Sequence, residues 1–183
     1  MVAGWSSQTS RAAAQSSPFH GSEAASAPVA VLSAAMYNEQ ANVREASDSV
    51  QAAIATEVLR SRLRDRLGAQ ILSFAATDSL AASAQSLRLA GGVPCNVKVE
   101  CAREVARQLG ARWVVLAKVS KTSNLIWLLS AQLIRVSTGE IILDDSTELK
   151  GEPGPMVRVG VRSFADRVVR TVQAGGYATN YPQ

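Results

Sequence analysis

Residues 111–150 carry the clearest alternation of hydrophobic and polar positions in the chain. Three runs, the first two rich in Val, Ile, Leu and Trp, are separated by two polar segments, residues 121–124 and 137–140, whose small residues reverse a backbone easily. The even positions of the middle run are mixed, whereas its odd positions are all apolar: Leu125, Trp127, Leu129, Ala131 and Leu133. This pattern predicts an antiparallel meander whose central strand has one core face and one partly polar face.

The third run changes character along its length. It begins with apolar Ile141 and Leu143 and continues with polar Asp144, Ser146 and Glu148 on one side. Polar and charged side chains of this kind protect an edge strand from pairing with another chain. We therefore expect this run to form the edge of the sheet.

The residues before and after the meander predict helices and two further strands. Apolar runs at 28–33 and 70–75 are typical of short buried strands, and apolar positions at helical spacing predict helices at 48–67, 77–89, 97–109 and 155–173. Helical crossovers make the first strand relations parallel, and the tight turns make the meander antiparallel. The expected fold class is α/β (mixed): a five-stranded mixed sheet, order roughly 2-1-3-4-5, with a C-terminal antiparallel meander and flanking helices.

Composition places one domain between two tails. The chain has 183 residues, of which 47% are hydrophobic and 19% charged, enough for a single core. Residues 1–27 are rich in Ala and Ser without apolar periodicity, so we expect a flexible tail, a single domain at 28–173 and a flexible C-terminus at 174–183. No apolar run approaches the ~18 residues that span a bilayer. The tail has neither the basic start nor the apolar segment of a signal peptide.

The two cysteines lie six residues apart, at Cys95 and Cys101. Asn96 is a suitable N-cap for the helix at 97–109, and the residues around a helix start pack against each other, which brings the two sulfur atoms together. This arrangement favours a disulfide over a reduced buried pair. A metal site is the weakest alternative, because zinc needs two more ligands and the only histidine, His20, lies in the tail.

Catalytic chemistry finds little support in the sequence. Asp144 and Asp145 are adjacent on a strand, so they point to opposite faces, and we expect both to be solvated at the sheet edge. Arginines crowd the end of the helix at 48–67 and one face of the last helix, but cations at a helix C-terminus complement its dipole without any ligand. With a net charge of +4 and no interleaved aromatic residues, nucleic acid is a poor expectation. We therefore expect no catalytic, cofactor-binding or metal-binding residues.

A family resemblance rests on the cysteine pair and two further motifs. These are Leu109-Gly110-Ala111-Arg112-Trp113 at the start of the meander and Lys121-Thr122-Ser123-Asn124-Leu125, a Lys-x-Ser-Asn-Leu pattern. Together they resemble a small periplasmic α/β family of unknown function. More distantly, the chain is similar to the N-terminal domain of the Tol-system propeller protein and to curli-secretion lipoprotein domains.

The resemblance implies a mixed sheet flanked by helices, an exported protein, and action by binding partners or by assembling. The expected function is a non-catalytic periplasmic binding or assembly module of the bacterial cell envelope, with a protein partner and no cofactor; a homo-oligomer is compatible with it. The alternatives are an accessory protein to a periplasmic dehydrogenase or transport system, and a weak nucleic-acid binder. The expected signal sequence is not present in these 183 residues.

Overall fold

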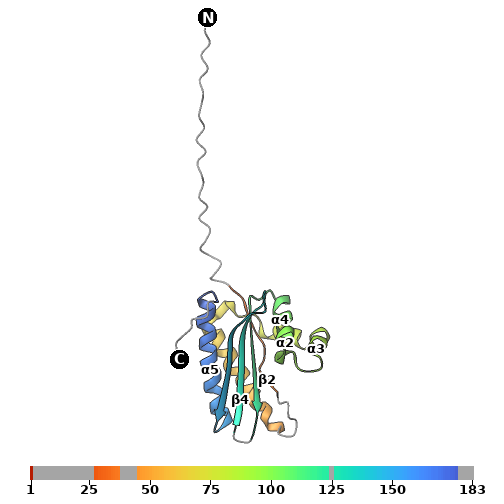
Figure 1. Ribbon diagram of the computed structural model, residues 1–183, viewed down its shortest axis with the longest axis vertical. Coiled ribbons are helices and arrows are strands. Elements are labelled where there is room, and N and C mark those ends of the chain that lie inside the picture. Colours follow the sequence, from red (N-terminus) through yellow and green to blue (C-terminus); the bar gives the residue numbers. More distant parts are fainter. Residues whose placement is uncertain (2–26, 38–44, 124–125, 177–183) are drawn as a thin grey trace.

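A mixed five-stranded sheet forms the centre of the computed structural model, which describes residue 1 and residues 27–37, 45–123 and 126–176 (Figure 1). The strands are β1 (Val29–Val31), β2 (Ala35–Met36), β3 (Trp113–Lys121), β4 (Ile126–Arg135) and β5 (Ile141–Lys150). Their order is β1-β3-β4-β5, and β2 pairs with β3 beyond the end of β1. Both β1 and β2 run parallel to β3, whereas β3, β4 and β5 form an antiparallel meander. The predicted mixed α/β class with five strands is confirmed. The predicted strand order 2-1-3-4-5 differs from the observed one, because the run at 70–75 contributes only an isolated bridge beside β1 and the fifth strand is β2.

The meander has the register that the alternating pattern predicts. Trp127, Leu129, Ala131 and Leu133 of β4 are all buried, and the residues between them are only partly covered. β5 lies at the edge of the sheet with mostly exposed side chains. Asn124 and Leu125, at the first turn, lie outside the described residues, as do nearly all of the expected N-terminal tail and the last seven residues of the chain.

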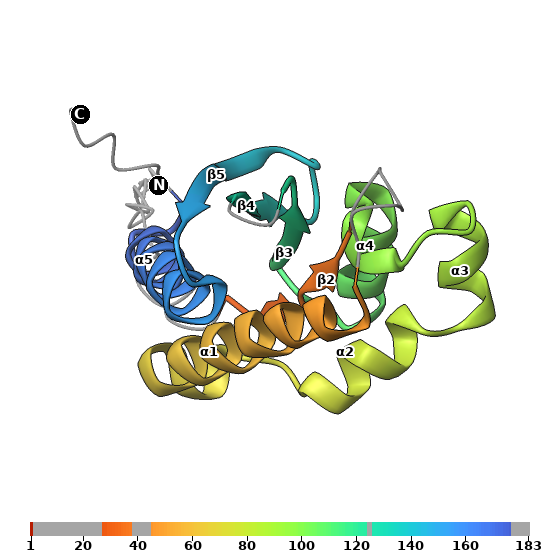
Figure 2. The same ribbon diagram turned by 90° about the horizontal axis from the view of Figure 1, so that it is seen from below.

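Two long helices cover one face of the sheet. They are α1 (Ser49–Leu67) and α5 (Pro153–Gln173), which lie side by side and bury Leu59, Leu63 and Phe164 in the larger core (Figure 2). Gly160 allows α5 to approach the sheet closely, since a Cβ there would lie 3.0 Å from the side chain of Leu129. This face of the meander is therefore closed by helices.

Three shorter helices cover only part of the other face. They are α2 (Phe74–Ala81), α3 (Ala84–Ala90) and α4 (Val99–Gln108), which close a second core around Leu32, Val114 and Ile134. Seen end-on in Figure 2, they lie beyond β2 and β3, and none of the helices in the described residues lies over the same face of β4 and β5. Much of this face is consequently left to polar side chains.

The predicted strand at 70–75 and the single helix at 77–89 are wrong. Gln70 ends a short 3-10 turn (Gly68–Gln70), and only Ile71 forms an isolated bridge to Val29. The hydroxyl of Ser73 then accepts a hydrogen bond from the Ala76 backbone N–H and caps α2. The hydroxyl of Ser83 does the same for α3, so local capping by serine splits the predicted helix in two.

Candidate functional site

The uncovered sheet face presents a cluster of polar side chains, which we call the open face. It consists of Lys118 from β3, Ser130 and Gln132 from β4, and Asp144 and Ser146 from β5. Ser130 is the cross-strand partner of both Lys118 and Ser146, and Gln132 donates a hydrogen bond of 3.1 Å to Asp144. These residues alternate with the buried positions of the same strands, so the strand period itself places them on one surface.

A cavity of about 180 Å³ lies on this face. The open-face side chains form its base, and Asn96 and Val97 of the 3-10 turn η5 (Cys95–Val97) contribute to its lining from outside the sheet. Its lining therefore offers an ammonium group, a carboxylate, two hydroxyls and two amides. Such a surface can hold a ligand by several hydrogen bonds of mixed charge.

The predicted disulfide between Cys95 and Cys101 is present and ties η5 to α4. The two Cα atoms are 5.3 Å apart, and both side chains are buried in the second core. Asn96 does not cap the helix as predicted, because the backbone remains in the 3-10 turn until Lys98, which is the N-cap of α4. The bridge instead fixes the segment that lines one part of the cavity.

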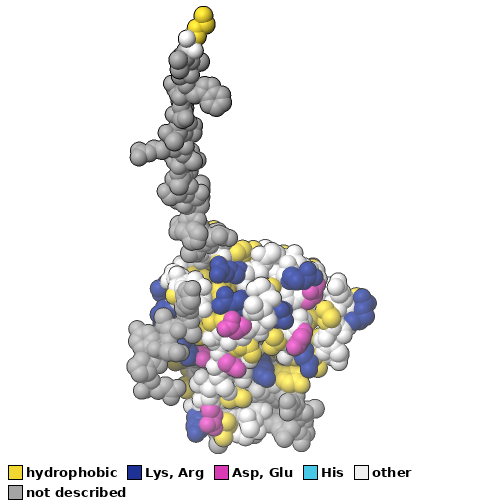
Figure 3. All heavy atoms as spheres, turned by 45° about the horizontal axis from the view of Figure 1, so that its top comes forward, with side chains coloured by type: hydrophobic (Ala, Val, Ile, Leu, Met, Phe, Trp, Pro, Cys, Tyr) yellow, Lys and Arg dark blue, Asp and Glu magenta, His cyan; other side chains and the backbone are white. Residues whose placement is uncertain are grey.

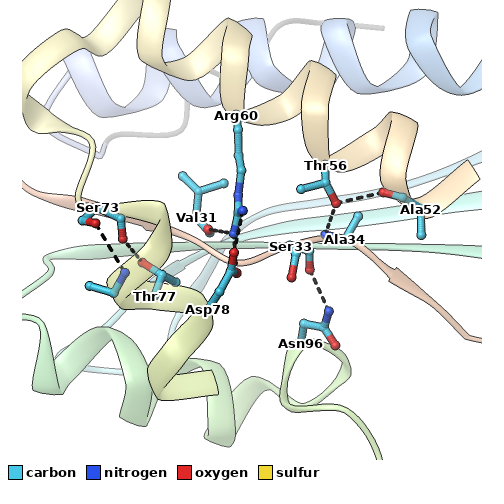
Figure 4. Close-up of polar contacts among 11 residues, drawn as sticks. Val31, Ser33, Ala34, Ala52, Thr56, Arg60, Ser73, Thr77, Asp78 and Asn96 are labelled. Carbon is cyan, nitrogen blue, oxygen red and sulfur yellow. Dashed lines mark hydrogen bonds and ion pairs between the residues drawn. The ribbon is translucent and has the colours of Figure 1, made fainter. Parts of the chain in front are cut away.

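Asn96 does not cap α4 and instead forms a hydrogen bond to the connection between β1 and β2. Its Nδ2 donates to the carbonyl oxygen of Ser33 at 2.7 Å, and its Oδ1 is buried without a hydrogen-bond partner among the described residues (Figure 4). From Val31 at the end of β1 to Ala35 at the start of β2 the chain advances four positions, whereas the paired segment of β3 advances three, from Val115 to Lys118. The extra residue makes a bulge, which redirects the strand locally.

Helix α1 holds this bulge from the opposite side of the sheet. The hydroxyl of Thr56 accepts from the backbone N–H of Ala34 at 2.8 Å, and the guanidinium of Arg60 donates to the carbonyl of Val31 at 3.1 Å (Figure 4). Arg60 also forms a two-point ion pair with Asp78 of α2, at 2.6 and 2.8 Å. This hydrogen bonding to Arg60 lowers the pKa of the Asp78 carboxyl, although partial burial opposes the shift. The bulge is thus fixed by α1, α2 and η5 together.

The Lys-x-Ser-Asn-Leu motif begins with a buried ion pair. Lys121 lies at the end of β3, where its Nζ is 3.2 Å from the Asp48 carboxylate and 3.4 Å from Glu45. Burial of Lys121 acts to lower its pKa, but hydrogen bonds to Asp48 and Glu45 outweigh it, so the pKa is raised. The ammonium also lies 5.6 Å from the centre of the Trp127 ring. Lys121 therefore ties the meander to the start of α1.

The neighbouring aspartates of β5 do point to opposite faces. Asp144 belongs to the open face, but Asp145 is buried and pairs with Arg167 of α5, so the expectation that both are solvated is wrong for Asp145. The crossing of α5 over β5 covers it. Within the described ranges, no group of three or more His, Cys, Asp or Glu side chains could hold a metal ion. In the same ranges, no helix is both long and apolar enough to cross a membrane.

The fold and the open face define a small mixed α/β domain with one polar, uncovered sheet face. Residues 27–167 match the model of the family DUF3280, whose description is "Protein of unknown function (DUF2380)". The chain belongs to this family. No curated protein matches it.

Solved structures with a similar fold come from several bacteria. The LpoB C-terminal domain from Salmonella enterica is 22% identical, with a TM-score of 0.44 over 69% of this chain and 84% of that chain. The PelC dodecamer from Paraburkholderia phytofirmans is 21% identical, with a TM-score of 0.42 over 81% and 89%. TolB from Acinetobacter baumannii is 12% identical, with a TM-score of 0.47 over 82% and 29%. These similarities concern the fold alone.

Proposed function

We propose that this protein is a non-catalytic binding module of the bacterial cell envelope, which engages a protein partner through its open face without a cofactor. The observation that carries the proposal is the asymmetry of the sheet. Helices close one face of the meander, whereas Lys118, Ser130, Gln132, Asp144 and Ser146 remain uncovered on the other. A sheet face that carries both charges and several hydroxyl and amide groups suits a partner surface that is itself polar.

The Cys95–Cys101 disulfide supports an exported location. Disulfides persist in oxidising compartments such as the bacterial periplasm and are rare in the cytosol, where thiols are kept reduced. The bridge stabilises the turn that lines the cavity, so the oxidising compartment and the binding surface are linked through the same residues. We infer that the protein acts in the periplasm.

The unpartnered Asn96 oxygen supports the position of the binding surface. A buried polar atom without a hydrogen bond carries a cost of ~1–3 kcal/mol, and because this oxygen is closed off from solvent, a donor from a partner relieves that cost only if the turn η5 shifts on binding. Asn96 lines the cavity, and its other polar atom is already fixed by Ser33. We infer that the partner donates a hydrogen bond at this position.

Site-specific photo-cross-linking in the native bacterium tests the proposal. A photoreactive amino acid replaces exposed Ser146 on the open face in one variant and exposed Ser163 on α5 in the control. We expect an adduct of defined mass at Ser146 and not at Ser163. An excess of wild-type protein should prevent formation of the Ser146 adduct by competing for the partner. An excess of the Asp144→Arg variant should not, because the arginine reverses a charge on the same surface.

Two results would overturn the proposal. Equal adducts at Ser146 and Ser163 would show that the open face has no preference for a partner, and no adduct at Ser146 would show that it is not occupied. Cell fractionation gives an independent measurement of location. Recovery only from the cytosol would contradict the envelope assignment, even if the open face were occupied.

A further inference from the structure

The ends of three helices and of several strands lie together at one end of the domain. The C-terminus of α1 lies beside the start of β1, since Ile71 bridges to Val29, and α4 ends just before β3 begins. The C-terminus of α5 reaches the same end, where Gly176 contacts the Trp113 side chain. The β4–β5 turn is here too, because Arg135 pairs with Trp113. This end of the domain is at the top of Figure 1.

Arginine is concentrated at this end, which we call the arginine end. Its seven arginines are Arg64 and Arg66 from α1, Arg103 and Arg107 from α4, Arg112, Arg135, and Arg170 from α5. Three carboxylates accompany them, Asp65, Glu104 and Glu140. Arg11, Glu23, Glu39 and Arg44 lie outside the described residues, which leaves 17 basic and 13 acidic residues in the described ranges. Without the arginine end, ten of each remain, so the net charge of +4 of the described residues lies at this end. In Figure 3, where this end is turned toward the viewer, Lys and Arg side chains are spread over the surface, with some Asp and Glu side chains between them.

Internal structure accounts for only part of this charge. Arg107 pairs with Glu104, Arg135 pairs with Glu140, and Arg103 donates to the Val136 carbonyl. The three helix C-termini add about half a negative charge each, which would offset about 1.5 of the four remaining positive charges. Arg66, Arg112 and Arg170 are exposed and form no ion pair within the described part of the chain. Arg66 and Arg170 help to lower the pKa of the Asp166 carboxyl, but hydrogen bonding to Arg62 is the largest cause of that shift. The positive charge at this end therefore exceeds what its ion pairs and the helix C-termini neutralise.

We propose that the arginine end lies against an anionic phospholipid surface. Guanidinium groups bind phosphate in a two-point geometry, and no lysine occurs among the basic residues of this end. The charges come from the ends of three helices and of the sheet, so they are spread over a whole end of the domain, as contact with a plane requires. Among the residues that the structure describes at this end, the aromatic one is Trp113, and it is buried beneath Arg112 and Arg135, so its ring is not available for stacking with a nucleic-acid base.

The path of the chain agrees with this orientation. Ala27 is the first residue of the domain that the structure describes after residue 1, and the adjoining Pro28 accepts backbone hydrogen bonds from Arg112 at 2.8 Å and from Trp113 at 3.1 Å. The chain therefore joins the domain at the arginine end, and 26 residues precede that point. The proposal concerns a different surface from the open face and does not depend on it.

Vesicle co-sedimentation of the full chain tests the proposal. The probes are phosphatidylcholine vesicles with and without about 30 mol % phosphatidylglycerol, a content that gives a negative surface potential. The test variant is Arg66→Gln/Arg112→Gln/Arg170→Gln. The control variant, Lys98→Gln/Arg158→Gln/Arg162→Gln, removes the same charge away from the arginine end. Unchanged circular dichroism and melting temperature would show that both variants fold.

We expect the wild type and the control variant to bind the anionic vesicles and not to bind the neutral vesicles. The test variant should lose about 100-fold in affinity, since each arginine near such a surface contributes a factor of about five. Raising the salt to about 0.3 M should release the wild type, because this screens the charges. Equal loss by both variants, binding to neutral vesicles, or retention of duplex DNA without retention of anionic vesicles would each overturn the proposal.

Discussion

Replacing Trp127 by alanine should destabilise the domain strongly. The side chain is 3% exposed, faces the larger core from the central strand of the meander, and lies against the Lys121 ammonium. A buried tryptophan removes about 200 Å² from water, which at about 25 cal/mol per Å² corresponds to about 5 kcal/mol. Alanine retains a small part of this and neighbouring side chains relax into the space, so we expect a loss of about 3–5 kcal/mol in the free energy of unfolding.

Phenylalanine at the same position provides the matched control. The indole N–H of Trp127 is buried without a hydrogen-bond partner among the described residues. Trp127→Phe keeps most of the apolar contact and removes this unsatisfied donor, whose burial costs about 1–3 kcal/mol. The gain offsets the loss of ring volume, so the phenylalanine variant should lie within about 1 kcal/mol of wild type.

Urea unfolding followed by circular dichroism measures both changes without relying on the altered fluorophore. With a slope of about 2 kcal/mol/M, a loss of 4 kcal/mol shifts the midpoint by about 2 M. An alanine variant within about 1 kcal/mol of wild type would contradict the burial of Trp127. A phenylalanine variant as unstable as the alanine variant would show that the indole N–H makes a hydrogen bond that the structure lacks.

Three further outcomes are expected. Protein purified from the native bacterium without reductant should resist alkylation at Cys95 and Cys101 and gain two labels only after reduction; two free thiols would contradict the disulfide in the cell. Asp78→Asn should lower stability at neutral pH by about 1 kcal/mol, since the side chain of its partner Arg60 is 12% exposed but that of Asp78 is 43% exposed. Because the pKa of Asp78 is lowered from 3.8, this difference should shrink as pH falls below that value, and a difference constant down to pH 2 would contradict the pairing. Deleting residues 2–26 should leave the melting temperature unchanged, and a large decrease would show that they pack against the domain.

The meander could be predicted from sequence because two independent signals agree. Alternating apolar positions fix which face of β4 is buried, and polar turns fix where the strands reverse, so a shift of one residue would bury Ser130 and Gln132. The run at 70–75 has no such agreement. Its apolar residues suit a strand or a helix start equally, and the Ser73 cap decides in favour of α2.

The open face could be predicted only in part. Its polar residues lie at the even positions of β4 and at the edge strand, where the alternating pattern already indicates a partly polar surface. The cavity also needs η5, which the disulfide and the Asn96–Ser33 hydrogen bond hold beside β3. That hydrogen bond joins residues 63 positions apart and depends on a bulge between β1 and β2. Local patterns do not encode such a long-range contact.

The orientation of the strands relates the two proposed surfaces. β3, β4 and β5 run between the arginine end and the opposite end, where the β3–β4 connection lies, so the open face is parallel to the strands and the arginine end is transverse to them. In a domain whose arginine end contacts a membrane, the strands would therefore run along the bilayer normal. The open face would then point sideways, parallel to the membrane surface. A partner in the surrounding solution would then reach Lys118, Ser146 and Asn96 without displacing the domain from the lipid. The two surfaces also differ in chemistry, because guanidinium groups dominate one and mixed hydrogen-bonding groups the other. Raised salt should consequently release the domain from anionic vesicles, whereas the yield of the Ser146 adduct formed by irradiation at that salt should change little.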